Sequence, residues 1–305
     1  MERLDGGAAL PARWRGGVVA LGNFDGFHAG HQAVAGRAIA RARAVGAPAL
    51  IATFDPHPVR FFAPDVPPFA LTSIDQRARL FVEAGADAMI VFPFNAELAA
   101  LTAEAFVAER LAGLAGVVTG EDFTFGKGRG GNVSVLAELG SRYGFVAEAV
   151  HPVNEGEQII SSSRIRDALQ AGDCPTAASL LTRPFAIEGR VQHGDKLGRT
   201  IGFPTANIAL GTYLRPRYGI YAVRAKLPDG RIVDGAANIG IRPTFDPPKE
   251  LLEVFLFDFD EALYDAAIEV ELHAFIRPEA KFDTLDALTA QMARDCDAAR
   301  AILAA

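Results

Sequence analysis

The feature that most limits the possible folds of this chain is a regular alternation of apolar runs and helix-like segments over its first half. Buried-strand signals lie at residues 17–21, 48–54, 88–92, 117–119 and 145–150. Apolar residues at helical spacing lie at 32–45, 75–84, 103–114 and 134–143. Strands that alternate with helices in this way form a parallel sheet covered on both faces. The sequence therefore predicts an open, Rossmann-like α/β domain.

The pattern changes near Arg183, where short β-rich stretches replace the strand and helix alternation. Six of them lie at 185–192, 205–209, 219–225, 232–238, 252–257 and 268–275. They predict a small six-stranded antiparallel β-barrel, closed by a terminal helix over 285–303, and residues 164–182 read as helical connecting material. At roughly 150 residues per domain, 305 residues suit two domains, which we assign to 1–182 and 183–305.

Composition excludes several classes of function. The 30 basic and 37 acidic residues give a net charge of −7, so nucleic acid is not an expected partner. The two cysteines, Cys174 and Cys296, form neither a disulfide framework nor a metal knuckle. The first twenty residues show no apolar core of signal-peptide length, and no apolar run approaches about 18 residues. We therefore expect a cytoplasmic protein without a membrane partner. The sequence leaves the oligomeric state open.

A glycine-rich segment with two histidines, Gly22 to His31, follows the first predicted strand. Open α/β sheets bind ligands beyond the carboxyl ends of their strands, and the N-terminus of the next helix suits a phosphate. His28 and His31 are three residues apart, so both can project from one side of that turn and donate to phosphate oxygens. Two ordinary turn histidines are the alternative, and a zinc pair lacks further ligands at the usual spacing.

Two other segments of the first half carry weaker signals. Residues 126–131 contain a formal GxGxxG motif. Glu148 follows it at roughly the spacing at which a dinucleotide-binding fold has an acidic residue. The motif does not directly follow a strand, so it reads as a basic loop near the ligand or as a loop without a role. Residues 53–58 predict a rigid loop in which Asp55 and His57 are structural.

The second half carries its own candidate phosphate site. The chain lacks a Walker A motif, which excludes a P-loop kinase. A glycine-rich turn over 189–199 can still hold phosphates through backbone N–H groups; its candidate residues are Gly194, Lys196, Gly198 and Arg199. Thr205 and Asn207 face one side of a predicted strand, and their oxygens suit Mg²⁺. A plain turn that enters a strand is the alternative.

Glu253 is a candidate general base. It lies between the apolar residues Leu251 and Phe255 on a predicted strand, so it shares a partly buried face. Burial raises the pKa of a carboxyl group towards the range of a useful base. An exposed glutamate on an edge strand is the alternative.

Several strings together resemble one family. The HxGH string of His28 to His31 is similar to the nucleotidylyltransferase signature, and Gly22 to Gln32 resembles bifunctional riboflavin kinase/FAD synthetase. Matching strings are TFDPHP at 53–58, GEDFTFG at 120–126 and SSSRIR at 161–166, and PTAN at 204–207 is the flavokinase hallmark. The similarity runs in order over nearly the whole chain.

The resemblance implies that riboflavin is phosphorylated to FMN and that FMN is then adenylylated to FAD, with ATP as co-substrate and Mg²⁺ in both steps. His28 and His31 would steady the transferring phosphate, and Glu253 would take the proton of the riboflavin hydroxyl. The implied binding residues of the first domain are Gly22, Asn23, Phe24, Asp25, Asp122, Ser162, Ser163, Arg164 and Arg166. Arg277, with Lys281 and Phe282, would border the flavin. The serine run would also cap a helix before Arg164.

Three positions depart from the family pattern, and two other functions stay open. Ser163 stands where Thr is frequent, Asp265 stands where Gly is usual, and Pro247-Pro248 interrupt the loop over 244–250. One alternative is an adenylyltransferase for another phosphate acceptor, with the barrel as an accessory. The other is a flavin-binding or delivery protein without turnover. Thr205, Asn207 and Glu253 speak against a passive barrel.

Overall fold

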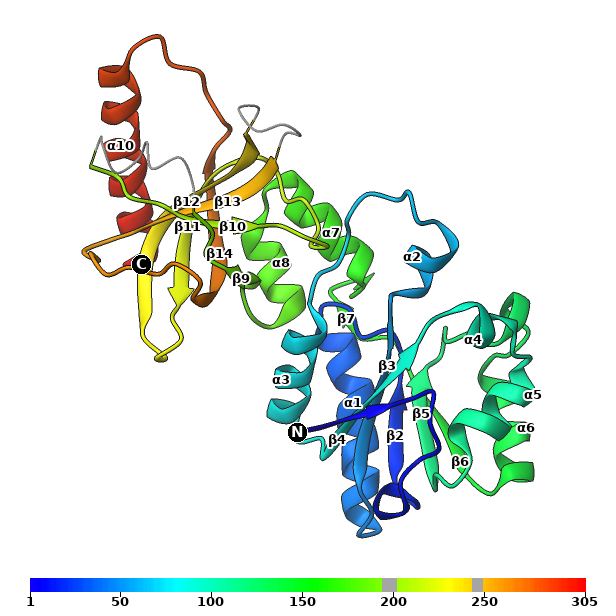
Figure 1. The fold of residues 1–305 in the computed structure, drawn as a ribbon. Coiled ribbons are helices and arrows are strands. Elements are labelled where there is room, and N and C mark those ends of the chain that lie inside the picture. Colours follow the sequence, from blue (N-terminus) through cyan, green and yellow to red (C-terminus); the bar gives the residue numbers. More distant parts are fainter. Residues whose placement is uncertain (194–201, 243–248) are drawn as a thin grey trace. The chain divides into compact units, whose positions relative to one another are not determined.

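A computed structural model describes residues 1–193, 202–242 and 249–305 (Figure 1). Backbone contacts divide the chain into two compact units, one of residues 1–67 and 72–161 and one of residues 68–71 and 162–305. Helices α7 and α8 fall in the second unit, whereas the sequence places them before a boundary at residue 182. That boundary stays a prediction, and each unit is described by itself.

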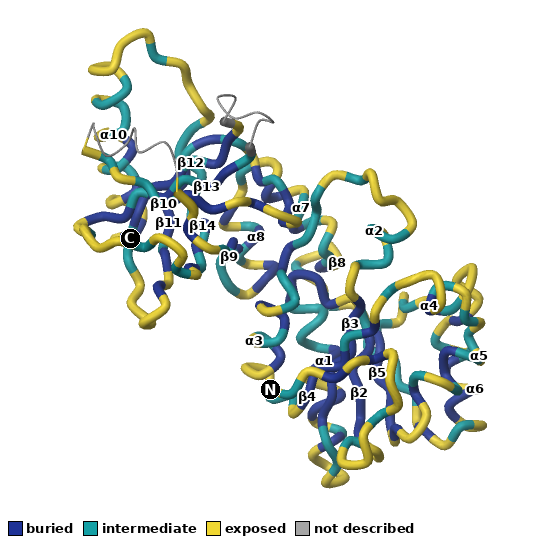
Figure 2. The backbone as a smooth tube through the Cα atoms, in the orientation of Figure 1, coloured by how far each residue is buried: buried dark blue, intermediate teal, exposed yellow. Residues whose placement is uncertain are grey.

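The first unit is built on an open six-stranded parallel sheet, as predicted. Its strand order is β1-β4-β3-β2-β5-β6, with every neighbouring pair parallel. The strands are β1 (Glu2–Asp5), β2 (Val18–Leu21), β3 (Ala49–Asp55), β4 (Ala88–Pro93), β5 (Gly116–Gly120) and β6 (Val146–Val150). Most residues of the inner strands are buried, as the dark tube in Figure 2 shows. The edge strand β1 was not predicted.

Helices cover both faces of this sheet. They are α1 (Ala29–Ala44), α3 (Ile74–Ala84), α4 (Ala96–Ala100), α5 (Ala103–Phe106) and α6 (Val133–Tyr143), whereas the short helix α2 (Pro58–Phe62) has no buried residue. Val18 and Ala20 of β2 belong to one core cluster with residues of α1 and α3, and Val19 and Leu21 belong to another with residues of α4, α5 and α6. Alternate residues of a strand point to opposite faces, so β2 is buried on both sides.

Shorter elements complete the first unit. They are the 3₁₀ turns η1 (Ala12–Trp14) and η3 (Lys127–Arg129), the π-helical turn η2 (Val107–Leu111), and the hairpin of β7 (Asn154–Glu155) and β8 (Gln158–Ile159). The single helix expected over 103–114 is wrong in its continuity, because α5 passes into the π turn η2. Apolar spacing alone does not distinguish these two hydrogen-bond patterns.

The second unit is a six-stranded antiparallel barrel with flanking helices, as predicted. Its strand order is β10-β13-β12-β11-β14-β9, and an antiparallel bridge between Gln192 and Asn207 brings the chain after β9 beside β10. The strands are β9 (Phe185–Arg190), β10 (Ala206–Ala209), β11 (Gly219–Lys226), β12 (Ile232–Arg242), β13 (Lys249–Leu256) and β14 (Ala267–Arg277). The helices are α7 (Ser162–Ala171), α8 (Cys174–Leu181) and the terminal helix α10 (Leu285–Leu303).

The terminal helix α10 covers one face of the barrel strands. Ala222 of β11 and Ala236 of β12 form a buried cluster with Ala299 and Leu303 of α10. Neighbouring residues of β11, such as Tyr221, are fully buried and point to the opposite face. No helix in the described part of the chain is long and apolar enough to cross a membrane.

Candidate active sites

His28 and His31 lie together at the start of α1. The Nδ1 atom of His28 caps the helix by accepting a hydrogen bond from the backbone N–H of His31, at 3.3 Å. The two imidazole rings are stacked, with their centroids 3.6 Å apart and an angle of 19° between the ring planes. An imidazole that accepts at Nδ1 carries its proton at Nε2 when it is neutral. The helix terminus and the His28 ring can therefore both present donors to an anion.

The loop before these histidines is held by buried aromatic side chains. Phe24 and Phe27 have positive φ angles of 50° and 43°, and both rings pack edge-on against Phe81 of α3. This packing offsets the strain of a left-handed backbone at non-glycine residues. A Cβ atom at Gly30 would lie 3.2 Å from the His28 ring, so the glycine of the HxGH string lets the ring lie against the helix.

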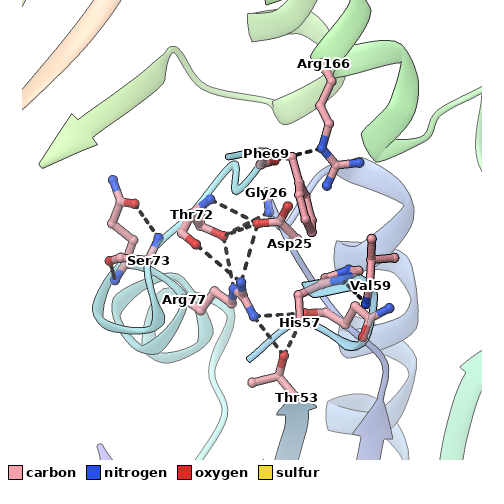
Figure 3. Close-up of polar contacts among 12 residues, drawn as sticks. Asp25, Gly26, Thr53, His57, Val59, Phe69, Thr72, Ser73, Arg77 and Arg166 are labelled. Carbon is pink, nitrogen blue, oxygen red and sulfur yellow. Dashed lines mark hydrogen bonds and ion pairs between the residues drawn. The ribbon is translucent and has the colours of Figure 1, made fainter. Parts of the chain in front are cut away.

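A buried polar network also holds this loop (Figure 3). Asp25 and Arg77 are 2% and 5% exposed, and their charged groups form an ion pair at 3.5 Å. Arg77 also donates to the Asn23 carbonyl at 3.2 Å and to the Thr53 hydroxyl at 3.1 Å. The backbone N–H of Thr72 donates to Asp25 at 3.1 Å. Two separate segments, β3 with Thr53 and residues 72–77 at the start of α3, thus hold the loop that precedes His28.

The other predicted residues of the first half have mixed surroundings. Asp122 is exposed in the loop after β5, which is a neighbour of β2 in the sheet. The GxGxxG segment forms the 3₁₀ turn η3 inside a loop, apart from the first strand and helix. Asp55 ends β3 and is exposed, and His57 caps α2 by accepting from the Val59 N–H at 3.2 Å.

The serine run begins α7 of the second unit. The helix starts at Ser162, two residues earlier than the sequence suggested, so Ser162, Ser163 and Arg164 all lie in its first turn. Arg166 donates from Nε to the Phe69 carbonyl at 2.9 Å, and its guanidinium lies over the Phe69 ring at 5.1 Å. Arg166 therefore has a structural contact in its own unit, beside the ligand role that the resemblance implies.

In the barrel, strand register places Asn207 and Glu253 side by side. Asn207 of β10 is directly opposite Glu253 of β13, and Glu253 is in turn opposite Asn238 of β12. Directly paired residues project to the same face of a sheet, so the three side chains form one row. Glu253 is half-buried and Asn207 is 8% exposed. Thr205 stands two residues before Asn207 and is also half-buried.

The remaining barrel predictions divide between described and undescribed residues. Arg277 makes two hydrogen bonds to the buried Asp295 of α10, at 2.8 and 2.6 Å, and lies 5.9 Å from the Phe282 ring. Its guanidinium thus ties β14 to α10. Asp265 has a φ of 62°, the left-handed conformation that a glycine adopts most easily. Gly194, Lys196, Gly198, Arg199 and Pro247-Pro248 lie outside the described residues.

Sequence reasoning missed two residues of these sites, Arg77 and Asn238. Arg77 lies four residues before Phe81, which is fully buried, so the signal was a basic residue on the apolar stripe of a helix. Asn238 lies within an apolar run of β12. A polar side chain in such a run needs a partner, and this was the available signal.

An open parallel sheet with paired histidines at a helix start, together with a barrel that carries an Asn, Glu and Asn row, is the arrangement expected of a protein with two phosphate-transfer modules. Family models agree: FAD synthetase matches residues 10–164 and riboflavin kinase matches residues 181–303. Bifunctional riboflavin kinase/FMN adenylyltransferase of Escherichia coli K12 is 41% identical over 92% of this chain and 90% of its own length. The protein of that name from Bacillus subtilis 168 is 41% identical over 91% and 90%.

The chain therefore belongs to the bifunctional riboflavin kinase/FMN adenylyltransferase family. One solved structure shares its fold over nearly the whole length. A crystal structure described as a macrolide-efflux protein from Streptococcus pneumoniae matches with a TM-score of 0.87 and 30% identity, over 98% of this chain and 99% of that one.

Proposed function

We propose that this chain converts riboflavin to FMN and then FMN to FAD, with ATP as the donor in both steps. Membership of the bifunctional family supports both activities. The observation that carries the proposal is that each unit has its own set of groups for phosphate chemistry. One unit has the stacked pair His28 and His31, and the other has the paired residues Asn207 and Glu253. We assign adenylyl transfer to residues 1–182 and phosphorylation to 183–305.

In the kinase step, Glu253 acts as the general base. The 5′-hydroxyl oxygen of riboflavin forms a bond to the γ-phosphorus of ATP, and the bond from that phosphorus to the β,γ-bridging oxygen breaks. The hydroxyl proton passes to the Glu253 carboxylate, and ADP leaves. A carboxylate on a half-buried face can be held in position for this proton transfer and is partly shielded from bulk water. FMN is the product.

Asn207 and Thr205 are the residues that we assign to Mg²⁺ in the kinase step. Their side-chain oxygens are hard, neutral ligands that suit Mg²⁺ shared with phosphate oxygens. Asn207 is 8% exposed, so its amide is shielded from the water that would otherwise compete for the ion. When bound, Mg²⁺ neutralises charge on the triphosphate.

In the adenylylation step, no protein nucleophile is needed. A phosphate oxygen of FMN forms a bond to the α-phosphorus of ATP, and the bond from that phosphorus to pyrophosphate breaks. The N-terminus of α1 and the His28 and His31 rings stabilise the negative charge on the α-phosphate oxygens. We assign the loop Gly22 to Asp25, Asp122, Ser162, Ser163, Arg164 and Arg166 to substrate binding, where Arg164 would meet phosphate as a charged donor.

A product assay on the full chain tests this function. Riboflavin, ATP and MgCl₂ are incubated with the protein, and flavins are separated by chromatography over time. We expect FMN to appear first and FAD to follow. FMN without FAD would remove the adenylyl-transfer assignment, FAD formed only from added FMN would remove the kinase assignment, and unchanged riboflavin and FMN would contradict both.

A further inference from the structure

Asn238 occupies a position in the barrel that the reaction described above does not use. In the register of β12 and β13 it is directly opposite Glu253, on the side away from Asn207. Side chains of directly opposed residues have Cβ atoms about 4.5–5.5 Å apart. Asn238 is therefore an immediate neighbour of the proposed base, and Glu253 separates it from the proposed Mg²⁺ ligand.

The orientation of the Asn238 amide follows from its contact with Glu279. The Nδ2 atom donates to Glu279 Oε1 at 3.2 Å. Glu279 can lie over β12 because residue 240 is glycine, where a Cβ atom would be 2.1 Å from the same carboxylate oxygen. A carboxylate accepts but does not donate when it is ionised. The NH₂ group must therefore face Glu279, and the amide oxygen points to another neighbour.

That oxygen is an acceptor without a donor. Asn238 Oδ1 is shielded from solvent and has no hydrogen-bond partner within the described residues 1–193, 202–242 and 249–305. A buried acceptor in this state is unfavourable, and such atoms are rare unless a ligand or water completes them. Its neighbour in the row, Glu253, is itself an acceptor. The missing donor is therefore expected from a bound molecule.

The donor must sit beside the hydroxyl that Glu253 deprotonates. That hydroxyl has a single hydrogen, which goes to Glu253 in the proposed step, so it cannot also serve Asn238. An acceptor substrate with further hydroxyl groups on the same chain meets the requirement, and the ribityl chain of riboflavin is such a polyol. A ribose hydroxyl of ATP has the same chemistry. We favour the polyol because Asn207, on the far side of Glu253, is the residue assigned to the triphosphate and its metal.

We propose that Asn238 Oδ1 accepts a hydrogen bond from a ribityl hydroxyl other than the one phosphorylated, and so determines specificity for a polyol side chain. This inference rests on the proposed kinase function. It makes Asn238 a substrate-binding residue that recognises the ribityl side chain of the flavin and not its ring system.

The test compares two flavins with wild-type protein and Asn238→Ala, using the full chain with Mg-ATP. One flavin is riboflavin, and the other has a 5-hydroxypentyl chain in place of the ribityl chain, so it keeps only the reacting hydroxyl. We expect Asn238→Ala to lower kcat/KM for riboflavin about tenfold, the effect of one lost hydrogen bond of about 1.4 kcal/mol. With the pentyl analogue the same variant should stay within about twofold of wild type.

The ratio of the two kcat/KM values is the decisive quantity, because it does not depend on how much of a variant is folded. Asn238→Ser, which keeps a hydroxyl acceptor, should recover part of the preference for riboflavin. Asp234→Asn on the same strand, where Asp234 is bonded to Arg224, is the matched control and should keep the wild-type ratio.

Three results would overturn the inference. An equal loss on both flavins would make Asn238 a structural residue. A change in preference between ATP and 2′,3′-dideoxy-ATP, with the flavin ratio unchanged, would assign the contact to the nucleotide. If wild-type protein makes no FMN from riboflavin, the proposed kinase function fails as well, and this result is distinct from the other two.

Discussion

Asn207 and Glu253 are directly opposed residues of the antiparallel strands β10 and β13. Their side chains project to one face of the barrel, where one brings a neutral amide oxygen and the other a half-buried carboxylate. A phosphoryl-transfer site needs charge neutralisation on the donor and a base on the acceptor at a short separation. In the proposed kinase site, the pairing of β10 with β13 places the two groups at this separation.

Glu253→Gln should abolish FMN formation and leave FAD formation from added FMN unchanged. The amide cannot take the hydroxyl proton, and a positioned general base contributes about 10²–10⁴-fold to rate. Chromatography of reactions started from riboflavin or from FMN measures the two steps separately. Glu269→Gln, at a half-buried position on β14, is the matched control. If Glu253→Gln still makes FMN at more than a tenth of the wild-type rate, Glu253 is not the base.

His28→Ala combined with His31→Ala should stop FAD formation while FMN still accumulates. The double variant removes both rings from the start of α1, and the loss of one charge-stabilising donor costs about 10²–10³ in rate. The measurement is the same product assay with riboflavin and ATP. His151→Ala in the same unit, where the side chain is 89% exposed, should behave as wild type. Equal loss of FMN and FAD would contradict the division of labour between the units.

Arg77→Met should destabilise the first unit strongly. It leaves the Asp25 carboxylate buried without its ion-pair partner, and breaking a buried pair costs about 3–5 kcal/mol. Urea unfolding followed by Trp14, the only tryptophan and a residue of the first unit, measures the free energy of unfolding.

Two comparison variants make the Arg77 prediction specific. Adding Asp25→Asn should recover part of the loss, because the buried carboxylate charge that Arg77 balances is then removed as well. Arg3→Met breaks an exposed pair with Asp75 and should change stability by at most about 1 kcal/mol. If Arg77→Met is no more destabilising than Arg3→Met, the network does not hold the loop.

The two thiols should be unreactive in the folded protein at pH 8. Burial raises the pKa of Cys174 to about 12 and that of Cys296 to about 11, from an ordinary value of 9.0. A thiol reagent should therefore react slowly with native protein and modify two thiols per chain in guanidinium chloride. Rapid reaction of both thiols in the native state would contradict this expectation.

The same shift sets a pH dependence of stability. The folded state holds the Cys174 proton more tightly than the unfolded state does, so the protonated thiol contributes to the free energy of unfolding. This contribution is fully present below about pH 9 and is lost as the pH rises towards about 12. The urea midpoint should fall between pH 8 and pH 10, and it should fall less in Cys174→Ala.

Much of the fold could be predicted because its signals are local. The strands β2 to β5 are buried on both faces, so each reads as a continuous apolar run. Strand β1 was missed since Glu2–Asp5 is a short edge strand with charged residues. The prediction of one continuous α-helix over 103–114 was wrong, because side-chain periodicity does not reveal the π turn at Val107–Leu111.

In the candidate sites too, residues close together in the sequence could be predicted to lie together, whereas residues brought together only by the fold could not. His28 and His31 are neighbours in sequence, so their spacing alone predicted that they lie together. Arg77 is far from Asp25 along the chain, and Asn238 is far from Glu253. That each pair lies close together depends on where α3 starts and on the register of β12 with β13, which local sequence does not specify.

The most direct test of two separate phosphate-transfer sites is to follow each phosphorus of ATP into the products. The full chain is incubated with riboflavin and ATP labelled with ³²P at either the γ or the α position, and FMN and FAD are counted after separation. We expect γ-label in both FMN and FAD, and α-label in FAD alone. The appearance of α-label in FMN, or of FAD without α-label, would contradict this prediction.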